Sequence, residues 1–156
     1  MSEHEDDLTP TLAEARRRRA DIHRALVEAE EAISGPALGR EAEWAREVID
    51  ALAALRETIE EHIEVTERSE GLYDEILHKA PRLADAVRRL REEHPLMRDK
   101  ISEAITRLRT TPVGAMWPLE EARDDLQRLL GRIVKHRQLG ADLVWEAYNL
   151  DIGGLD

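Results

Sequence analysis

The sequence predicts an all-α fold, an up-down-up-down antiparallel four-helix bundle, from three observations. Apolar residues recur at spacings of three and four along four long segments, the pattern of helices that bury one face. Phenylalanine is absent and aromatic residues make up only 3% of the 156 residues, so aliphatic side chains must build the core. Charged residues make up 37% of the chain, a composition typical of helical bundles. Short to moderate connections between the segments favour antiparallel neighbours.

We expect a single domain over residues 10–150, because a chain of this length suits one core. Its four helices are predicted at about 11–33, 40–68, 81–109 and 118–148. Residues 1–9 are expected to form a disordered acidic tail, and residues 151–156 a second short tail.

The first two helices have recognisable starts and stripes. Thr9 or Thr11 can cap the first helix, with Pro10 in its first turn. The apolar stripe of this helix comprises Ile22, Leu26, Ala29 and Ile33. The stripe of the second helix contains a histidine and comprises Val48, Leu52, Leu55, Ile59 and His62. A short helical piece at 72–77 leads on to Pro81.

The last two helices also place a histidine on the apolar stripe. The third shows Val87, Leu90, His94, Met97, Ile101, Ala104 and Leu108, and Pro95 beside the histidine is expected to kink it. The fourth shows Ala122, Leu126, Leu129, Ile133, His136, Gly140, Leu143 and Ala147. Three helices therefore place a polar imidazole ring on a buried face, and each buried ring needs a hydrogen-bond or metal partner.

Composition excludes several classes of function. The chain has 23 Lys and Arg against 34 Asp and Glu, a net charge of −11, which argues against nucleic-acid binding. The basic run at 16–19 is interpreted as a solvated helix face. The absence of cysteine excludes disulfides and thiolate ligands, and no segment is long and apolar enough for a membrane span. With no secretory signal at the N-terminus, we expect a cytoplasmic protein.

Four of the six histidines, one per predicted helix, are expected to lie near one depth of the bundle. Residues at equal depth in an antiparallel pair are equidistant from the turn between them. The midpoint of His94 and His136 falls in the third connection, and that of His62 and His94 falls in the second. His23 fits less well, because its midpoint with His62 lies just past the first connection. Neutral imidazole is the commonest metal ligand, so the four histidines are candidate metal ligands.

The ordered set of motifs resembles the hemerythrin-like domain family, the HHE cation-binding group. The resemblance covers residues from about 12 to 150. It rests on AspIleHis at 21–23, GluHisIleGluValThrGlu at 61–67 with GlyLeuTyrAspGluIleLeu at 71–77, GluGluHisProLeu at 92–96 and HisArgGlnLeuGlyAlaAsp at 136–142. It implies a four-helix bundle with a non-haem di-iron centre held by histidines and bridging carboxylates. It also implies a role in dioxygen binding, iron storage, redox sensing or peroxide chemistry.

The sequence departs from the family pattern at both bridging carboxylates. The pattern has a Glu four residues after the histidine of the second and fourth helices, where this chain has Thr66 and Gly140. The nearest acidic residues, Glu67 and Asp142, are rotated by about 140° and 120° from the histidines that precede them. Glu67 is a candidate extra ligand if the helix unwinds after it. Three or four imidazoles suit one divalent ion such as iron or zinc, or no metal at all.

Thr66 and Gly140 are candidate contacts to a small bound ligand beside the histidines. Thr66 could donate a hydrogen bond to it, and Gly140 could leave room for it. Close approach of two helices, or room for a bulky aromatic neighbour, is the preferred explanation of the glycine.

Two hypotheses of function follow. In the first, the protein is a hemerythrin-like metal-binding protein, with iron as mono- or dinuclear cofactor, that handles oxygen species such as dioxygen or peroxide, or senses redox state. In the second, it is a metal-free interaction or regulatory module with a histidine layer in its core. Haem held between two histidines is a weaker third idea. The sequence does not decide whether the protein is an enzyme, since it contains no nucleophile–base motif and no phosphate-binding loop.

Overall fold

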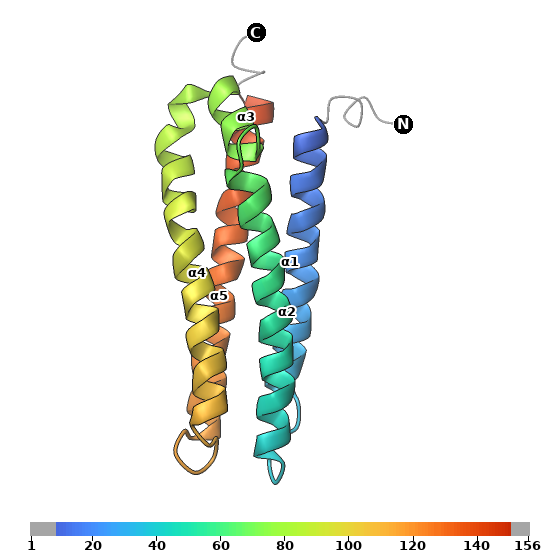
Figure 1. Cartoon of the computed structure of the whole chain (residues 1–156), viewed down its shortest axis with the longest axis vertical. Coiled ribbons are helices and arrows are strands. Elements are labelled where there is room, and N and C mark those ends of the chain that lie inside the picture. The colour runs from blue at the N-terminus through green and yellow to red at the C-terminus, as the bar shows by residue number, and fades with distance from the viewer. Residues whose placement is uncertain (1–8, 151–156) are drawn as a thin grey trace.

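The computed structural model describes residues 9–150 and is all-helical over that range, without a β-strand. Four long helices and one short helix account for most of it (Figure 1). The α-helices are α1 (Pro10–Ser34), α2 (Glu41–Glu67), α3 (Leu72–Lys79), α4 (Ala84–Thr110) and α5 (Leu119–Trp145). A 3₁₀ turn (Pro81–Leu83) precedes α4 and a π-helical turn (Glu146–Leu150) follows α5. The prediction of an all-α fold is therefore confirmed for these residues.

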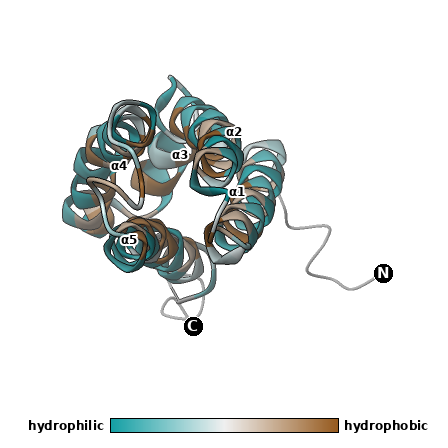
Figure 2. Cartoon of the chain, turned by 90° about the horizontal axis from the view of Figure 1, so that it is seen from below, coloured by the Kyte–Doolittle hydropathy of each residue, from teal (hydrophilic) through white to brown (hydrophobic). Residues whose placement is uncertain are grey.

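The four long helices lie side by side, with the start of α1, the end of α5 and all of α3 at one end of the bundle (Figure 1). The connections at 35–40 and 111–118 lie at the opposite end. Seen along this axis, hydrophobic residues face the interior and hydrophilic residues face outward (Figure 2). This is the segregation that the apolar stripes predict.

The helix boundaries agree with the expected ranges to within a few residues. Thr9, one of the two predicted caps, caps α1 by accepting a hydrogen bond from the backbone N–H of Leu12 at 3.0 Å, so the expected tail ends one residue earlier. The predicted third helix starts later than expected, because Pro81 begins a 3₁₀ turn and α4 starts at Ala84. Helix α4 then continues through Pro95 to Thr110. The remaining predicted tail residues, 1–8 and 151–156, lie outside the described residues.

Hydrophobic side chains fill the interior in two clusters, and the histidine layer lies between them. Most are aliphatic, but the buried Trp44 and Trp117 also belong to the larger cluster, so the prediction of a purely aliphatic core is wrong. Ile59, Met97 and Ile133 belong to the larger cluster, and Val65, Leu90 and Leu143 belong to the smaller cluster near α3. On each of the helices α2, α4 and α5, the histidine of the stripe falls between its two apolar neighbours. A polar layer thus interrupts the hydrophobic core at one depth.

Over residues 9–150, we find no helix with the length and apolar character required to cross a membrane.

Candidate metal centre

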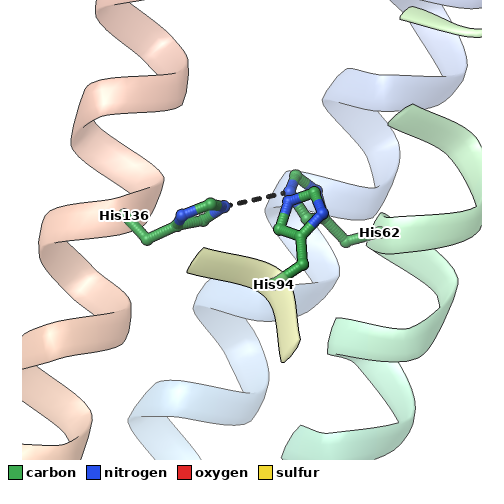
Figure 3. Close-up of side chains that lie close together, drawn as sticks. All are labelled: His62, His94 and His136. Carbon is green, nitrogen blue, oxygen red and sulfur yellow. Dashed lines mark hydrogen bonds between the residues drawn. The ribbon is translucent and has the colours of Figure 1, made fainter. Parts of the chain in front are cut away.

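Three imidazoles from three helices meet inside the bundle: His62 of α2, His94 of α4 and His136 of α5 (Figure 3). Their ring centroids are 5.0 to 5.5 Å apart, and one nitrogen from each ring lies within 4.8 Å of the others. His94 and His136 are buried, with 1% and 3% of their surface exposed. The predicted convergence at one depth is therefore confirmed for these three residues.

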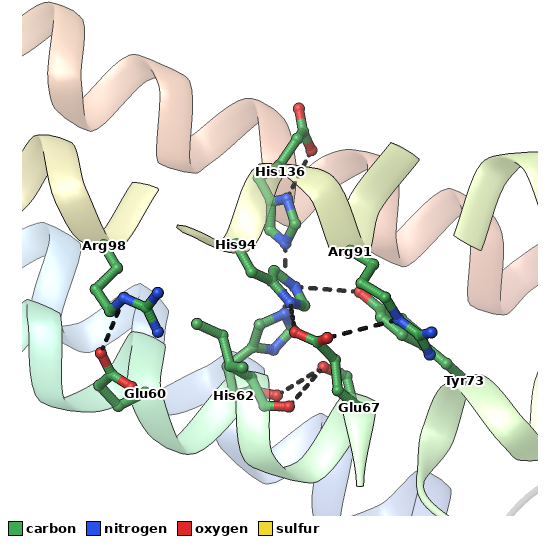
Figure 4. Close-up of polar contacts among 11 residues, drawn as sticks. Glu60, His62, Glu67, Tyr73, Arg91, His94, Arg98 and His136 are labelled. Carbon is green, nitrogen blue, oxygen red and sulfur yellow. Dashed lines mark hydrogen bonds and ion pairs between the residues drawn. The ribbon is translucent and has the colours of Figure 1, made fainter. Parts of the chain in front are cut away.

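Two of the three rings are held from behind by carboxylates (Figure 4). Nδ1 of His94 lies 2.6 Å from Oε2 of Glu67, and Nδ1 of His136 lies 2.7 Å from Oε1 of Glu93. An ionised carboxylate only accepts hydrogen bonds, so Nδ1 of each histidine carries the proton and Nε2 keeps its lone pair. Both carboxylates therefore fix the tautomer that presents Nε2 to the layer.

This assignment of protons also decides which of the remaining ring nitrogens donate and which accept hydrogen bonds. The Tyr73 hydroxyl, 3.2 Å from Nε2 of His94, donates to it. Nε2 of His62 lies 3.4 Å from Nε2 of His136 and donates to it in the same way. Nδ1 of His62 is then an acceptor, and it is buried with no hydrogen-bond partner among the described residues. An unpartnered buried polar atom costs about 1–3 kcal/mol, so the layer is incompletely satisfied by the protein alone.

Burial lowers the pKa of all three histidines, because it penalises the charged ring. The pKa of His62 lies well below its ordinary value. Burial and, to a smaller extent, the charge of His136 lower the pKa of His94 to about 3. These effects are larger than any increase in the pKa caused by the nearby Glu67 carboxylate. For His136, Glu93 opposes the effect of burial on the pKa. The rings are therefore neutral at pH 7, the state in which imidazole binds metals.

Glu67 is the last residue of α2, and a tight turn leads from it to Gly71. A Cβ on Gly71 would lie 2.6 Å from the carbonyl oxygen of Val65, so only glycine fits there. The sequence predicted Glu67 as a possible metal ligand after such unwinding. The structure places it at the outer nitrogen of His94, with its other oxygen 3.5 Å from Nε of Arg91.

A small cavity of about 30 Å³ lies against the open side of the cluster, where His62 and His136 form part of its wall. Most of its other walls are apolar, from residues such as Ile22 and Leu143. A cavity needs about 10–15 Å³ of such volume to hold one water molecule, so this cavity has room for a small ligand of about two or three heavy atoms.

Thr66 and Gly140 both line this cavity. Thr66 is 1% exposed, and its hydroxyl donates to the backbone carbonyl of His62 at 2.9 Å. A Cβ on Gly140 would meet no atom within 4 Å. The preferred explanation of Gly140, close packing against a helix or an aromatic ring, is therefore wrong, and the glycine enlarges the space beside the cluster.

The structure does not bring His23 into the cluster, which corrects its prediction as a ligand. His23 is exposed on α1 and lies beside a surface groove with Val27 and Val134. The preceding residue, Ile22, takes the buried position on α1. A helix turns by about 100° per residue, so the side chain of His23 emerges on a different face.

Sequence reasoning missed two residues of the site, Glu93 and Tyr73. Glu93 precedes His94 on α4 but reaches across to α5, which the spacing of the histidines does not reveal. Tyr73 stacks on His94, with ring centroids 5.8 Å apart. Its position in a motif directly after the helix-ending turn was the only available signal.

Comparisons with known proteins identify no relative of this chain. No protein-family model, no curated protein and no solved structure matches it significantly.

Proposed function

We propose that His62, His94 and His136 bind one divalent transition-metal ion through Nε2, with iron as the expected metal. The observation that carries the proposal is the pair of carboxylates behind His94 and His136. Histidines that ligate metals commonly donate their second ring N–H to a carboxylate, which fixes the tautomer and orients the ring.

The spacing of the nitrogens also supports this proposal. Two nitrogens bound at 2.0–2.1 Å to a tetrahedral ion lie about 3.4 Å apart. The Nε2 atoms of His62 and His136 are separated by 3.4 Å. Nε2 of His94 would exchange its hydrogen bond with Tyr73 for the metal. In the metal-free protein His62 donates from Nε2, so binding a metal there requires its proton to move to Nδ1, which has no hydrogen-bond partner within residues 9–150. With that change of tautomer, the three rings suit a single ion.

A single ion fits this chain better than two. Two cations need bridging oxygen ligands between them, and over residues 9–150 no carboxylate joins the group of three histidines. Glu67 and Glu93 contact the outer nitrogens, whereas Thr66 and Gly140 hold the positions where the family pattern has its bridging residues. We therefore propose a hemerythrin-like bundle of up-down-up-down topology with a non-standard, mononuclear centre.

The cavity gives this centre a place for an exogenous ligand. Metal sites with three protein ligands keep a fourth position open for water or substrate. We propose that the open position serves binding or sensing of a small oxygen species, dioxygen or peroxide, in the cytoplasm. Iron would supply the redox chemistry when bound, while the protein orients the ligand, excludes bulk water and keeps the imidazoles neutral.

One observation favours a second candidate, a metal-free interaction or regulatory module. Five of the six ring nitrogens of the cluster already have hydrogen-bond partners within the protein. A neutral histidine layer of this kind could persist without metal and respond to acidification.

We expect the chain, purified without a metal-affinity tag, to take up one Fe²⁺ per molecule under anaerobic conditions. Elemental analysis after removal of free metal measures the stoichiometry, and the visible spectrum before and after exposure to air reports on redox chemistry. No retained metal would contradict the proposed function and favour the metal-free module. Two ions per chain would contradict the single-ion centre.

We expect Glu67→Gln to weaken metal binding by about 10- to 100-fold, the effect of losing an outer partner of a metal ligand. Glutamine can accept the hydrogen bond from Nδ1 of His94 but carries no charge. Glu64→Gln is the matched control, since Glu64 is an exposed residue on the same helix. Competition with a chelator of known affinity measures both variants. Equal affinities of the two variants would contradict a role for Glu67.

A further inference from the structure

Three arginines without a carboxylate partner gather at the cavity beside the histidines: Arg16 and Arg19 of α1 and Arg137 of α5. Over residues 9–150, no ion pair joins any of the three to an acidic residue, although the chain has 34 Asp and Glu. The adjacent Arg18, by contrast, pairs with Glu61 at 3.2 Å. The interpretation of the basic run as a solvated face therefore fails at Arg19, which is partly buried in the cavity wall.

The three positive charges lie close enough to repel one another, and that of Arg19 also acts on the histidine cluster. Burial, then the charges of Arg137 and Arg16, lower the pKa of Arg19. The charge of Arg19 also contributes to the lowered pKa of His62. The Nε of Arg137 donates to the backbone carbonyl of Arg19 at 3.5 Å, which keeps its side chain against α1. Like charges held together at a cavity leave an attractive potential for an anion.

The size of the cavity limits what this anion can be. About 30 Å³ of free space favours a ligand of a few heavy atoms over a phosphate ester, a nucleotide or an organic cofactor. Guanidinium groups recognise planar carboxylates through paired N–H donors. The absent side chain of Gly140 leaves room between the apolar walls for one small group attached to the carboxylate of the ligand.

We propose that this cavity binds a small monovalent oxyanion of the carboxylate type, held by Arg19 and Arg137 and placed beside His62 and His136. This anion site extends the proposed function, because it specifies the charge of the ligand at the open position. Only the contact between anion and metal rests on the proposed function. The acidic partners of the cluster, Glu67 and Glu93, lie at the outer nitrogens of His94 and His136. The histidine layer therefore has acidic residues at its outer nitrogens and arginines at the cavity, so anions are attracted to the cavity.

Formate is the probe, and formamide is its uncharged control of the same heavy-atom count. Formate is titrated into metal-free and Co²⁺-loaded protein, and binding is read from the unfolding temperature and from the visible bands of Co²⁺. We expect formate to bind and formamide not to bind. Arg19→Gln and Arg137→Gln should each weaken formate binding by about tenfold or more, the effect of losing a charge-assisted hydrogen bond. Arg17→Gln, at an exposed position outside the cavity, should leave it unchanged.

Gly140→Ala tests the location of the anion. The added methyl group would enter open space and narrow the cavity, so we expect weaker formate binding in a correctly folded protein. Gly131→Ala is the matched control, because this glycine also lies in α5 with open space at its Cβ but does not line the cavity.

The outcomes separate this inference from the proposed function. Failure to take up any metal contradicts the metal centre, while formate binding to the metal-free protein that depends on Arg19 still supports the anion site. Equal formate affinity of Arg19→Gln and Arg17→Gln, binding of formamide as tight as that of formate, or no formate binding at all would overturn the anion site.

Discussion

The double substitution His94→Leu with Tyr73→Phe is expected to weaken metal binding by more than about 100-fold, since even the outer partners of metal ligands contribute about 10- to 100-fold. His94 supplies one of three donor nitrogens, and two imidazoles are too few to hold a divalent ion tightly. Wild-type protein at a metal concentration of 100 Kd gains about 2.7 kcal/mol of stability from the ion, and the variant should gain none. Chemical unfolding with and without Co²⁺ measures this difference.

Tyr73→Phe is included so that a loss of stability is not mistaken for a loss of metal binding. His94→Leu alone would remove the acceptor of the buried Tyr73 hydroxyl, and a lost hydrogen bond to a buried polar group costs about 1–3 kcal/mol. Removing both members of the hydrogen bond avoids that cost, and replacing buried polar groups by apolar ones is often neutral or stabilising. We therefore expect the metal-free variant to be at least as stable as the metal-free wild type. Undiminished uptake of one ion per chain would exclude His94 as a ligand.

The fold was predictable because the information for it is local. Stripes at helical spacing identify the four long helices, and the midpoints between histidines place three of them at one depth. The first connection is where this arithmetic was weakest, and the failure of His23 occurred there. Burial of Ile22 sets the rotation of α1 about its axis, and one residue of rotation moves His23 to the surface.

The partners of the histidines were not predictable in the same way. Glu93 and His136 are 43 residues apart, and their contact depends on how α4 and α5 are rotated against each other. Glu67 was identified from the sequence, but its contact with Nδ1 of His94 was not. Likewise, Gly140 indicated either close packing or space, and only the distances around its Cβ decide between them.

The metal-free protein is expected to lose stability steeply as the pH falls below about 6.5, the ordinary pKa of histidine. In the unfolded chain the three histidines take up protons near that pH. In the folded protein burial lowers the pKa of all three, with that of His62 well below its ordinary value and that of His94 at about 3, so these two rings stay neutral. Between these pH values the unfolded state binds more protons, and the free energy of unfolding must therefore fall as the pH falls. Each histidine that stays neutral contributes a loss of roughly 2 kcal/mol by pH 5.

His62 and His94 together should then remove about 4 kcal/mol between pH 7 and pH 5, a large part of the 5–15 kcal/mol that typically stabilises a domain. Denaturant unfolding of chelator-treated protein at pH 7, 6 and 5 measures the loss. The variant with His94→Leu and Tyr73→Phe should lose roughly 2 kcal/mol less over the same range, because one titrating ring is gone. Equal stability of the metal-free wild type at pH 7 and pH 5 would show that the rings are protonated in the folded state. Such rings would repel a cation, so this result would also weaken the case for a metal centre built on neutral imidazoles.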